Sequence, residues 1–191
     1  MIIEGLMTTV CDDGAVNLSP MGPLVDPSLT RFHLRPFQSS RTFKNLVSRG
    51  EAVFHVTDDV GLIARAAVGQ VEPFPEVKRA VEVDGWVVQR ACRWYELRVV
   101  TLDDSRDRAE IQCELVAQGR LRDFFGFNRA KHAVLEAAIL ATRVGFLPVE
   151  TILADMQRLE SLVSKTAGDQ EQAAFEFLDR YIREALMKGS G

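Results

Sequence analysis

The sequence predicts an α+β protein in which a β-rich first part is followed by a helical C-terminal part. Two observations favour this division. Short runs of β-branched and apolar residues, separated by turn residues, recur along the first part of the chain. Beyond about residue 125 the apolar residues recur every three or four positions, which is the spacing of helices. We therefore expect two domains, residues 1–124 and residues 125–188.

The first two strands are predicted at residues 2–11 and 15–22, on either side of the turn sequence Asp12-Asp13-Gly14. The glycine supplies the positive φ that a tight hairpin needs. Because side chains alternate between the faces of a strand, Asn17 and Ser19 should point to the same face.

The rest of the first part alternates strands with short helices. Strands are expected at residues 29–35, 51–57, 86–88, 94–100 and 109–116, and helices at 39–49 and 60–68. Pro73 and Pro75 mark a loop. Residues 81–119 are predicted to form one long antiparallel meander, with a hairpin at Asp103-Asp104-Ser105. The number and spacing of the strands indicate a small closed or nearly closed barrel.

Three helices are predicted in the C-terminal part. Asn128 is a favourable N-cap for a helix that runs to Arg143. Residues 133–141 of this helix are apolar on almost every side except for Glu136, as in buried helices. Pro148 is expected in the first turn of the second helix. Asp169, followed three residues later by Gln172, is close to a capping box at the start of the third helix.

Composition excludes several classes of protein. The 191 residues carry a formal net charge of −4, so nucleic acid is not the expected partner. The N-terminus lacks the basic and apolar regions of a signal peptide, and no apolar run approaches the roughly 20 residues of a membrane helix. The three cysteines are far apart in the sequence, as in a cytoplasmic protein with reduced thiols. We expect a cytoplasmic protein that binds neither nucleic acid nor membrane.

No catalytic side chain or metal site is indicated. His33, His55 and His132 are scattered, without a second ligand at metal spacing, and the first two are expected to be structural histidines. The sequence contains no serine elbow, no GxGxxG and no GxxxxGK[ST] loop. If the protein is an enzyme, a bound cofactor should therefore supply the chemistry.

A candidate phosphate site lies where a predicted strand passes into the helix at residues 39–49. The first N–H groups of a helix and its partial positive charge favour an anion, and hydroxyl and guanidinium groups can donate further hydrogen bonds. The candidate residues are Arg35, Ser39, Ser40, Arg41, Thr42 and Asn45. The alternative is that Ser39 or Ser40 is an ordinary N-cap and the basic residues form a solvated surface.

The order of these motifs resembles the flavin-reductase-like FMN-binding split barrels. The motifs are Asn17-Leu18-Ser19-Pro20-Met21-Gly22 at a strand end, and Ser39…Thr42-x-x-Asn45-Leu46 before the strand at residues 51–56. The tail, with Phe127-Asn128-Arg129-Ala130-Lys131-His132, is similar to one branch of that superfamily. The resemblance covers nearly the whole chain and implies an antiparallel split β-barrel of the FMN-binding type followed by a three-helix C-terminal domain.

The resemblance also implies FMN as cofactor and gives roles to particular residues. Thr42 and Asn45 fall where the superfamily contacts the phosphate, with Ser39, Ser40 and Arg35 or Arg41 as further donors. Asn17 and Ser19 would reach the pyrimidine edge of the flavin.

Four further residues receive expected roles. Met21 continues the face of the strand that carries Asn17 and Ser19, and Gly22 would let the backbone approach the ring. Asn128 and Arg129 begin a second helix and would form a lid over phosphate or substrate. The alternative for this pair is an ordinary cap and a surface arginine.

We expect an oxidoreductase in which hydride moves through flavin N5, with NAD(P)H or another small molecule as its reaction partner. No nicotinamide-binding element is recognisable, and two alternatives remain: a non-catalytic flavin-binding or sensory module, and a structural barrel whose pocket is empty.

A homodimer with the flavin at the subunit interface is also expected. A barrel of this size cannot easily cover apolar residues such as Trp94, Leu97 and Val99, and exposed apolar patches usually mark interfaces. The superfamily resemblance implies the same pairing. The alternative is that the C-terminal helices cover this surface. Trp86 and Trp94 are expected to be core or interface residues.

Overall fold

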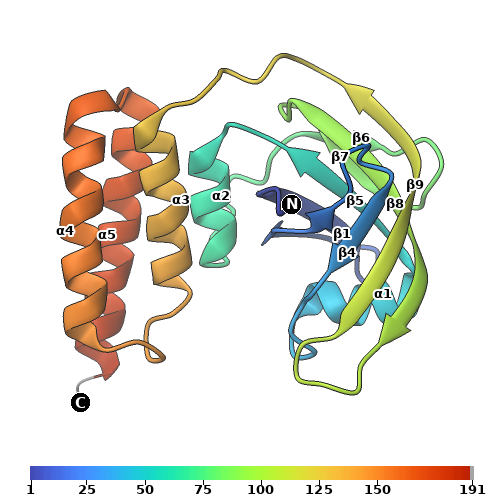
Figure 1. The fold of residues 1–191 in the computed structure, drawn as a ribbon, viewed down its shortest axis with the longest axis horizontal. Helices are drawn as coiled ribbons and strands as arrows, with labels where there is room; N and C mark the ends of the chain where they lie inside the picture. Colours follow the sequence, from blue (N-terminus) through green and yellow to red (C-terminus); the bar gives the residue numbers. More distant parts are fainter. Residues whose placement is uncertain (190–191) are drawn as a thin grey trace. The chain divides into compact units, whose positions relative to one another are not determined.

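A computed structural model describes residues 1–189 and divides the chain into two compact units (Figure 1). The barrel unit comprises residues 1–57 and 73–124, and the helical unit comprises residues 58–72 and the chain from residue 125 onward. The helical unit thus contains a segment from the first part of the sequence, which the boundary at residue 124 did not include.

The barrel unit is built on one antiparallel sheet of seven strands. These are β1 (Gly5–Val10), β2 (Val16–Met21), β3 (Leu24–Val25), β4 (Arg31–Leu34), β5 (Glu51–Val56), β8 (Arg93–Asp103) and β9 (Glu110–Arg120). Their order across the sheet is β2-β1-β5-β8-β9-β4-β3. The predicted hairpin joins β1 to β2, and Gly14 has the expected positive φ of 84°.

The sheet curls because of how its edges are connected. The two edge strands, β2 and β3, are separated in the chain by only Gly22 and Pro23, so the edges must lie close together. Irregular register between β8 and β9, after Glu96 and after Val99, bends the longest strands further. The predicted α+β fold with a split antiparallel barrel is confirmed.

The inner face of the sheet holds the core of this unit. Phe32, Phe54 and Tyr95 lie within it with ring centroids 5.5 to 6.5 Å apart. Helix α1 (Arg41–Arg49) packs Phe43 and Leu46 against the same core. The helix begins two residues later than predicted because Ser40 is its N-cap, accepting a hydrogen bond from the N–H of Phe43.

The outer face is covered by a short two-stranded ribbon, β6 (Val77–Arg79) and β7 (Trp86–Val88). The expected continuous meander is therefore wrong: β7 pairs with β6, which the sequence did not predict, while β8 pairs with β5 and β9. Three polar side chains of the sheet hold the ribbon and its loop, namely Thr8, His55 and Glu96.

The ribbon and the inner core cover two of the apolar residues on which the dimer prediction depended, Trp94 and Leu97. Trp94 packs with Val83 and Val87 of the ribbon segment and is only 8% exposed. Leu97 points to the inner face and is fully buried. One chain therefore covers Trp94 and Leu97 without a partner.

The helical unit contains α2 (Val60–Ala67), α3 (Arg129–Ala141), α4 (Val149–Thr166) and α5 (Asp169–Gly189). Figure 1 shows α3, α4 and α5 as neighbouring rods, and α2 packs against α3 and α5. Helix α3 is buried along most of its surface, as its composition predicts. None of the helices in the described part of the chain is long and apolar enough to cross a membrane.

Two of the predicted helix starts differ in detail. Pro148 occupies the N-cap position of α4 rather than its first turn. At the start of α5, the residue that closes the cap is Glu171, whose carboxylate accepts from the N–H of Gly168 at 2.9 Å. Gln172 instead donates to Glu176.

Candidate functional site

A cavity of about 280 Å³ lies in the barrel unit where the end of β2 meets the start of α1. The residues that line it are Ser19, Pro20, Met21, Gly22, Arg35, Pro36, Phe37, Ser40, Thr42 and Arg108. Six of these are residues that the sequence singled out: Ser19, Met21, Gly22, Arg35, Ser40 and Thr42. The fold thus brings together two motifs about 20 residues apart.

Hydroxyl groups form one wall of the cavity. Thr42 Oγ1 accepts a hydrogen bond from Asn17 Nδ2 at 3.1 Å and shares another with Ser19 Oγ at 2.7 Å. Two hydroxyls that share one hydrogen bond use one of their two hydrogens in it, so the pair retains one O–H for a ligand. Ser40 Oγ accepts from Phe43 N–H, which leaves its own hydrogen free to donate as well.

The hydroxyl wall is held in place by a buried polar network. Thr9 Oγ1 accepts from Asn45 Nδ2 at 2.8 Å and from Asn17 Nδ2 at 3.2 Å. Both Thr9 and Asn45 are buried. The network therefore runs from the interior of the unit to Thr42 at the cavity, and it orients Asn17 toward that hydroxyl.

Two arginines supply positive charge. Arg35 and Arg108 both line the cavity, and the guanidinium of Arg108 lies 4.1 Å from the ring centroid of Phe37. Stacking on an aromatic ring fixes the plane of the guanidinium without using its N–H donors. Together with the hydroxyls and the first N–H groups of α1, these side chains suit a phosphate ester.

Several predicted residues lie elsewhere in the structure. Ser39 and Arg41 are exposed and do not line the cavity. Asn45 does not line it either, because its side chain turns inward to Thr9 and Cys11. The structure therefore gives Asn45 a positioning role in the network rather than a place on the cavity wall.

Gly22 allows a close approach, but the atoms that approach belong to the chain itself. A Cβ at this position would lie 3.0 Å from both carboxylate oxygens of Glu4 and 3.2 Å from Ile2 Cγ2. The glycine therefore lets the N-terminal segment pass beside the cavity.

Asn128 and Arg129 belong to the helical unit. Asn128 caps α3, because its Oδ1 accepts from Lys131 N–H at 3.0 Å, and its Nδ2 donates to the carbonyl of Thr166 at 3.0 Å. Arg129 is exposed at the start of the helix. The capping role inferred from the sequence is present, and the lid role stays a prediction.

Sequence reasoning missed Phe37 and Arg108. Both follow from the register of β4 with β9, which pairs Leu34 with Ile111 and continues to a bridge between Phe37 and Arg108. No local motif marks Arg108, which lies in a short polar loop 66 residues after Thr42. Only knowledge of the strand pairing could have placed it here.

Comparison with protein families gives two matches. Residues 3–122 match the model described as the N-terminal domain of a protein of unknown function, DUF447. Residues 128–180 match a second DUF447 model. No curated protein matches this sequence.

Comparison with solved structures gives one similar chain over almost the full length. This FMN-bound protein from Methanosarcina mazei, described under DUF447, is 26% identical, with a TM-score of 0.80, covering 97% of this chain and 95% of that one. A 2-nitrobenzoate 2-nitroreductase from Pseudomonas fluorescens is 16% identical, with a TM-score of 0.53, over 61% of this chain and 64% of that one. A flavoredoxin from Methanosarcina acetivorans is 15% identical, with a TM-score of 0.53, over 62% and 68%. The last two show a shared barrel fold.

Proposed function

The chain belongs to the DUF447 family, and we propose that it binds FMN with the phosphate in the cavity at the start of α1. The observation that carries this proposal is the set of donors at one place: two arginines, three hydroxyl residues and a helix N-terminus. The similar chain from Methanosarcina mazei, which covers nearly all of this one, is FMN-bound.

The hydrogen-bond donors of the cavity suit the phosphate of FMN rather than its flavin ring. A phosphate ester accepts several hydrogen bonds, and each charge-assisted bond contributes roughly 1.5–3 kcal/mol. The remaining lining residues, Met21, Pro36 and Phe37, present apolar surface beside the donors. The ring would lie over this apolar surface, with Ser19 and Asn17 on the β2 side.

We propose further that the protein is a flavin-dependent oxidoreductase. Bound FMN supplies hydride transfer, which amino-acid side chains cannot carry out. Among the lining residues that the structure describes, none is a carboxylate, an imidazole or a thiol, so the chain itself would bind and orient rather than transfer protons. A non-catalytic flavin-binding module is the alternative. Steady-state oxidation of NADH or NADPH by the FMN-loaded protein separates the two.

The phosphate assignment is tested by titrating the flavin-free protein with FMN and with riboflavin. We expect FMN to bind at least about tenfold more tightly, since riboflavin lacks the charge-assisted hydrogen bonds. Arg35→Gln should reduce this preference. Arg31→Gln, at an exposed position of β4 just before Arg35 that does not line the cavity, is the matched control. Equal affinities for the two flavins in the wild-type protein would refute the assignment.

A homodimer with the flavin at the subunit interface is the third part of the proposal. Three exposed apolar residues, Met1, Ile2 and Leu24, lie together because Ile2 pairs with Leu24 and Met1 bonds to Val25. Ile2 also lies beside Gly22 of the cavity wall. This apolar surface, with the half-exposed Phe37 on the cavity, supports an interface that includes the flavin site.

A further inference from the structure

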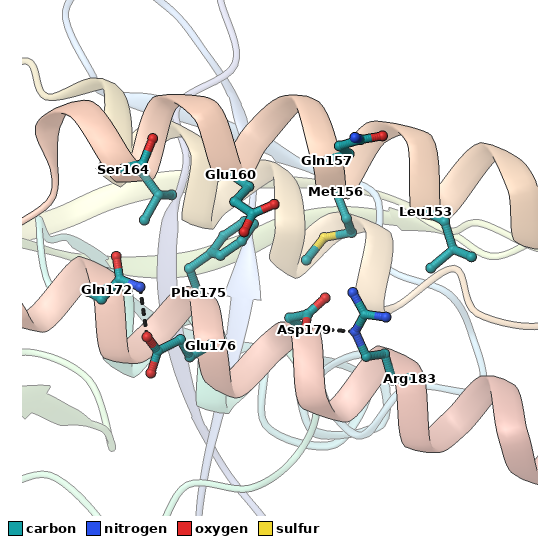
Figure 2. A pocket seen from close by; sticks show the side chains of 11 residues that line it. Leu153, Met156, Gln157, Glu160, Ser164, Gln172, Phe175, Glu176, Asp179 and Arg183 are labelled. Atoms are coloured by element: carbon teal, nitrogen blue, oxygen red, sulfur yellow. Dashed lines mark hydrogen bonds and ion pairs between the residues drawn. The ribbon is translucent and has the colours of Figure 1, made fainter.

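The helical unit contains a groove between α4 and α5 that the flavin site does not use (Figure 2). Its volume is about 490 Å³. The lining extends from Leu153 to Ser164 on α4 and from Gln172 to Arg183 on α5. Eleven residue steps on each helix correspond to a length of about 16 Å, or three helical turns. Figure 2 shows Ser164 opposite Gln172 at one end and Leu153 near Arg183 at the other.

The middle of the groove is acidic. Glu160 lies on the α4 wall, and Glu176 and Asp179 lie on the α5 wall (Figure 2). Arg183 is the one cationic residue in the described lining, and its Nε already donates to Asp179 Oδ2 at 2.8 Å. Glu160 and Glu176 therefore leave a surplus of two negative charges along the groove.

The end of the groove near Leu153 and Arg183 carries exposed apolar side chains. Leu153 is 39% exposed, and Val149, one helical turn before it on the same face of α4, is 42% exposed. Met187, one turn beyond Arg183 on α5, is 70% exposed. Of these three, Leu153 lines the groove, and Val149 and Met187 each lie one helical turn beyond a lining residue. A ligand that lay along the groove would cover apolar side chains at one end and meet carboxylates at the centre.

We propose that this groove binds a basic amphipathic helix of a partner protein. An amphipathic helix fits a groove whose two walls are themselves helices, and the groove is long enough to hold about three turns of it. Lysine or arginine beside the apolar stripe would meet Glu160 and Glu176. A second copy of the same groove would carry the same negative charge, and the anionic surface of a membrane would be repelled in the same way.

Binding is measured with the full-length protein and a labelled synthetic probe by fluorescence anisotropy. The probe is an amphipathic peptide of about five turns, with leucines at helical spacing and lysines beside them. A second peptide has glutamates in place of the lysines. We expect the lysine peptide to bind at least about tenfold more tightly than the glutamate peptide, and to lose affinity as salt is raised.

Variants locate the site. Glu160→Gln combined with Glu176→Gln should weaken binding of the lysine peptide about five- to tenfold, as expected for two partly exposed ion pairs. Glu150→Gln combined with Glu184→Gln makes the same charge change on exposed residues of the same helices outside the groove, and should leave the affinity unchanged. Leu153→Ser, which removes the apolar side chain without adding charge, should weaken binding of the lysine peptide at least about tenfold. Thermal unfolding of each variant confirms that it is folded.

Three results would overturn the proposal. One is equal affinity for the lysine and glutamate peptides, or an equal loss of affinity for the lysine peptide in the Glu160/Glu176 variant and in the Glu150/Glu184 control. Another is that neither peptide binds, whereas a small amphiphilic amine binds at Leu153. The occupant would then be a small molecule. The third is self-association of the wild-type protein that Leu153→Ser abolishes, which would make the occupant a second copy.

Discussion

At the scale of single residues, the proposed flavin site depends on side chains that contact one another. Asn45 bonds Thr9, Thr9 accepts from Asn17, and Asn17 bonds Thr42. A change at the interior end of this network should therefore alter the hydroxyls at the cavity. Because Thr42 is 3% exposed, a test of its hydroxyl must preserve the packing of its side chain.

Thr42→Val removes the hydroxyl and retains the branched shape. We expect the dissociation constant for FMN to rise about tenfold, the lower end of the loss of a charge-assisted hydrogen bond, with little change in stability. The affinity is measured by titration of the flavin-free protein. Ser48→Ala, in the same helix but bonded to Asp12, is the control. Unchanged affinity in Thr42→Val would show that this hydroxyl does not contact the phosphate.

His55 makes stability depend on pH. The imidazole is fully buried, with Nδ1 3.3 Å from the carbonyl of Leu6 and Nε2 accepting from the N–H of Val88 at 3.1 Å. Burial lowers its pKa from 6.5 to about 4, against a smaller opposing effect of the bond to Leu6. The neutral imidazole therefore suits the ribbon, and protonation would remove an acceptor that Val88 needs.

The free energy of unfolding should fall between pH 6.5 and about pH 4. In this window the unfolded chain binds a proton at His55 and the folded chain does not, so acid favours unfolding by a total of about 3 kcal/mol. Denaturant unfolding at several pH values measures the slope. His55→Gln should flatten it, whereas His132→Gln, at an exposed position of α3, should not. The same slope in wild type and His55→Gln would contradict this role.

At the scale of elements, two helix caps and the first hairpin were predictable, and the pairing of β7 was not. Ser40 and Asn128 cap their helices through the side-chain bonds that their positions predict. The pairing of β7 with β6 was not predictable, because it depends on the outer face of a sheet whose strands come from distant parts of the chain.

The cap of α3 provides the test at this scale. Asn128→Ala removes the bonds to Lys131 N–H and to the carbonyl of Thr166, and should destabilise the helical unit by about 1 kcal/mol. Chemical unfolding followed by circular dichroism measures this change, with Arg129→Ala as the control. If Asn128 is only a cap, the affinity for FMN stays at the wild-type value. Weaker FMN binding at unchanged stability would instead support the lid.

At the scale of the whole molecule, a curled sheet places the N-terminal segment beside the cavity. The segment pairs with the chain around β3, so Met1, Ile2 and Leu24 form one apolar surface. This surface replaces the strand at residues 94–100 as the basis for expecting a dimer.

We expect light scattering at micromolar concentration to give twice the 21.3 kDa mass of the chain. Leu24→Asp should dissociate the dimer and weaken FMN binding together, because the proposed interface includes the cavity. Val100→Asp introduces the same charge at a position of β8 that is 58% exposed, and should leave the dimer intact. A monomer of 21.3 kDa that binds FMN fully would disprove both the dimer and the shared site.

The sequence alone determined the parts of this protein that depend on neighbours along the chain. The turn at Gly14, the caps at Ser40 and Asn128, and the common face of Asn17 and Ser19 follow from local sterics and strand alternation, which act over a few residues. The two motifs of the proposed phosphate site were found in this way.

Only the tertiary structure decided which distant segments meet. It brought Arg108 to the cavity, turned Asn45 toward Thr9, and placed residues 58–72 in the helical unit. Each depends on partners more than 30 residues away, where the burial of apolar surface and the satisfaction of buried polar groups select one arrangement among many. A local sequence pattern does not predict these contacts, because the same residues could pack against or bond to other segments of the chain.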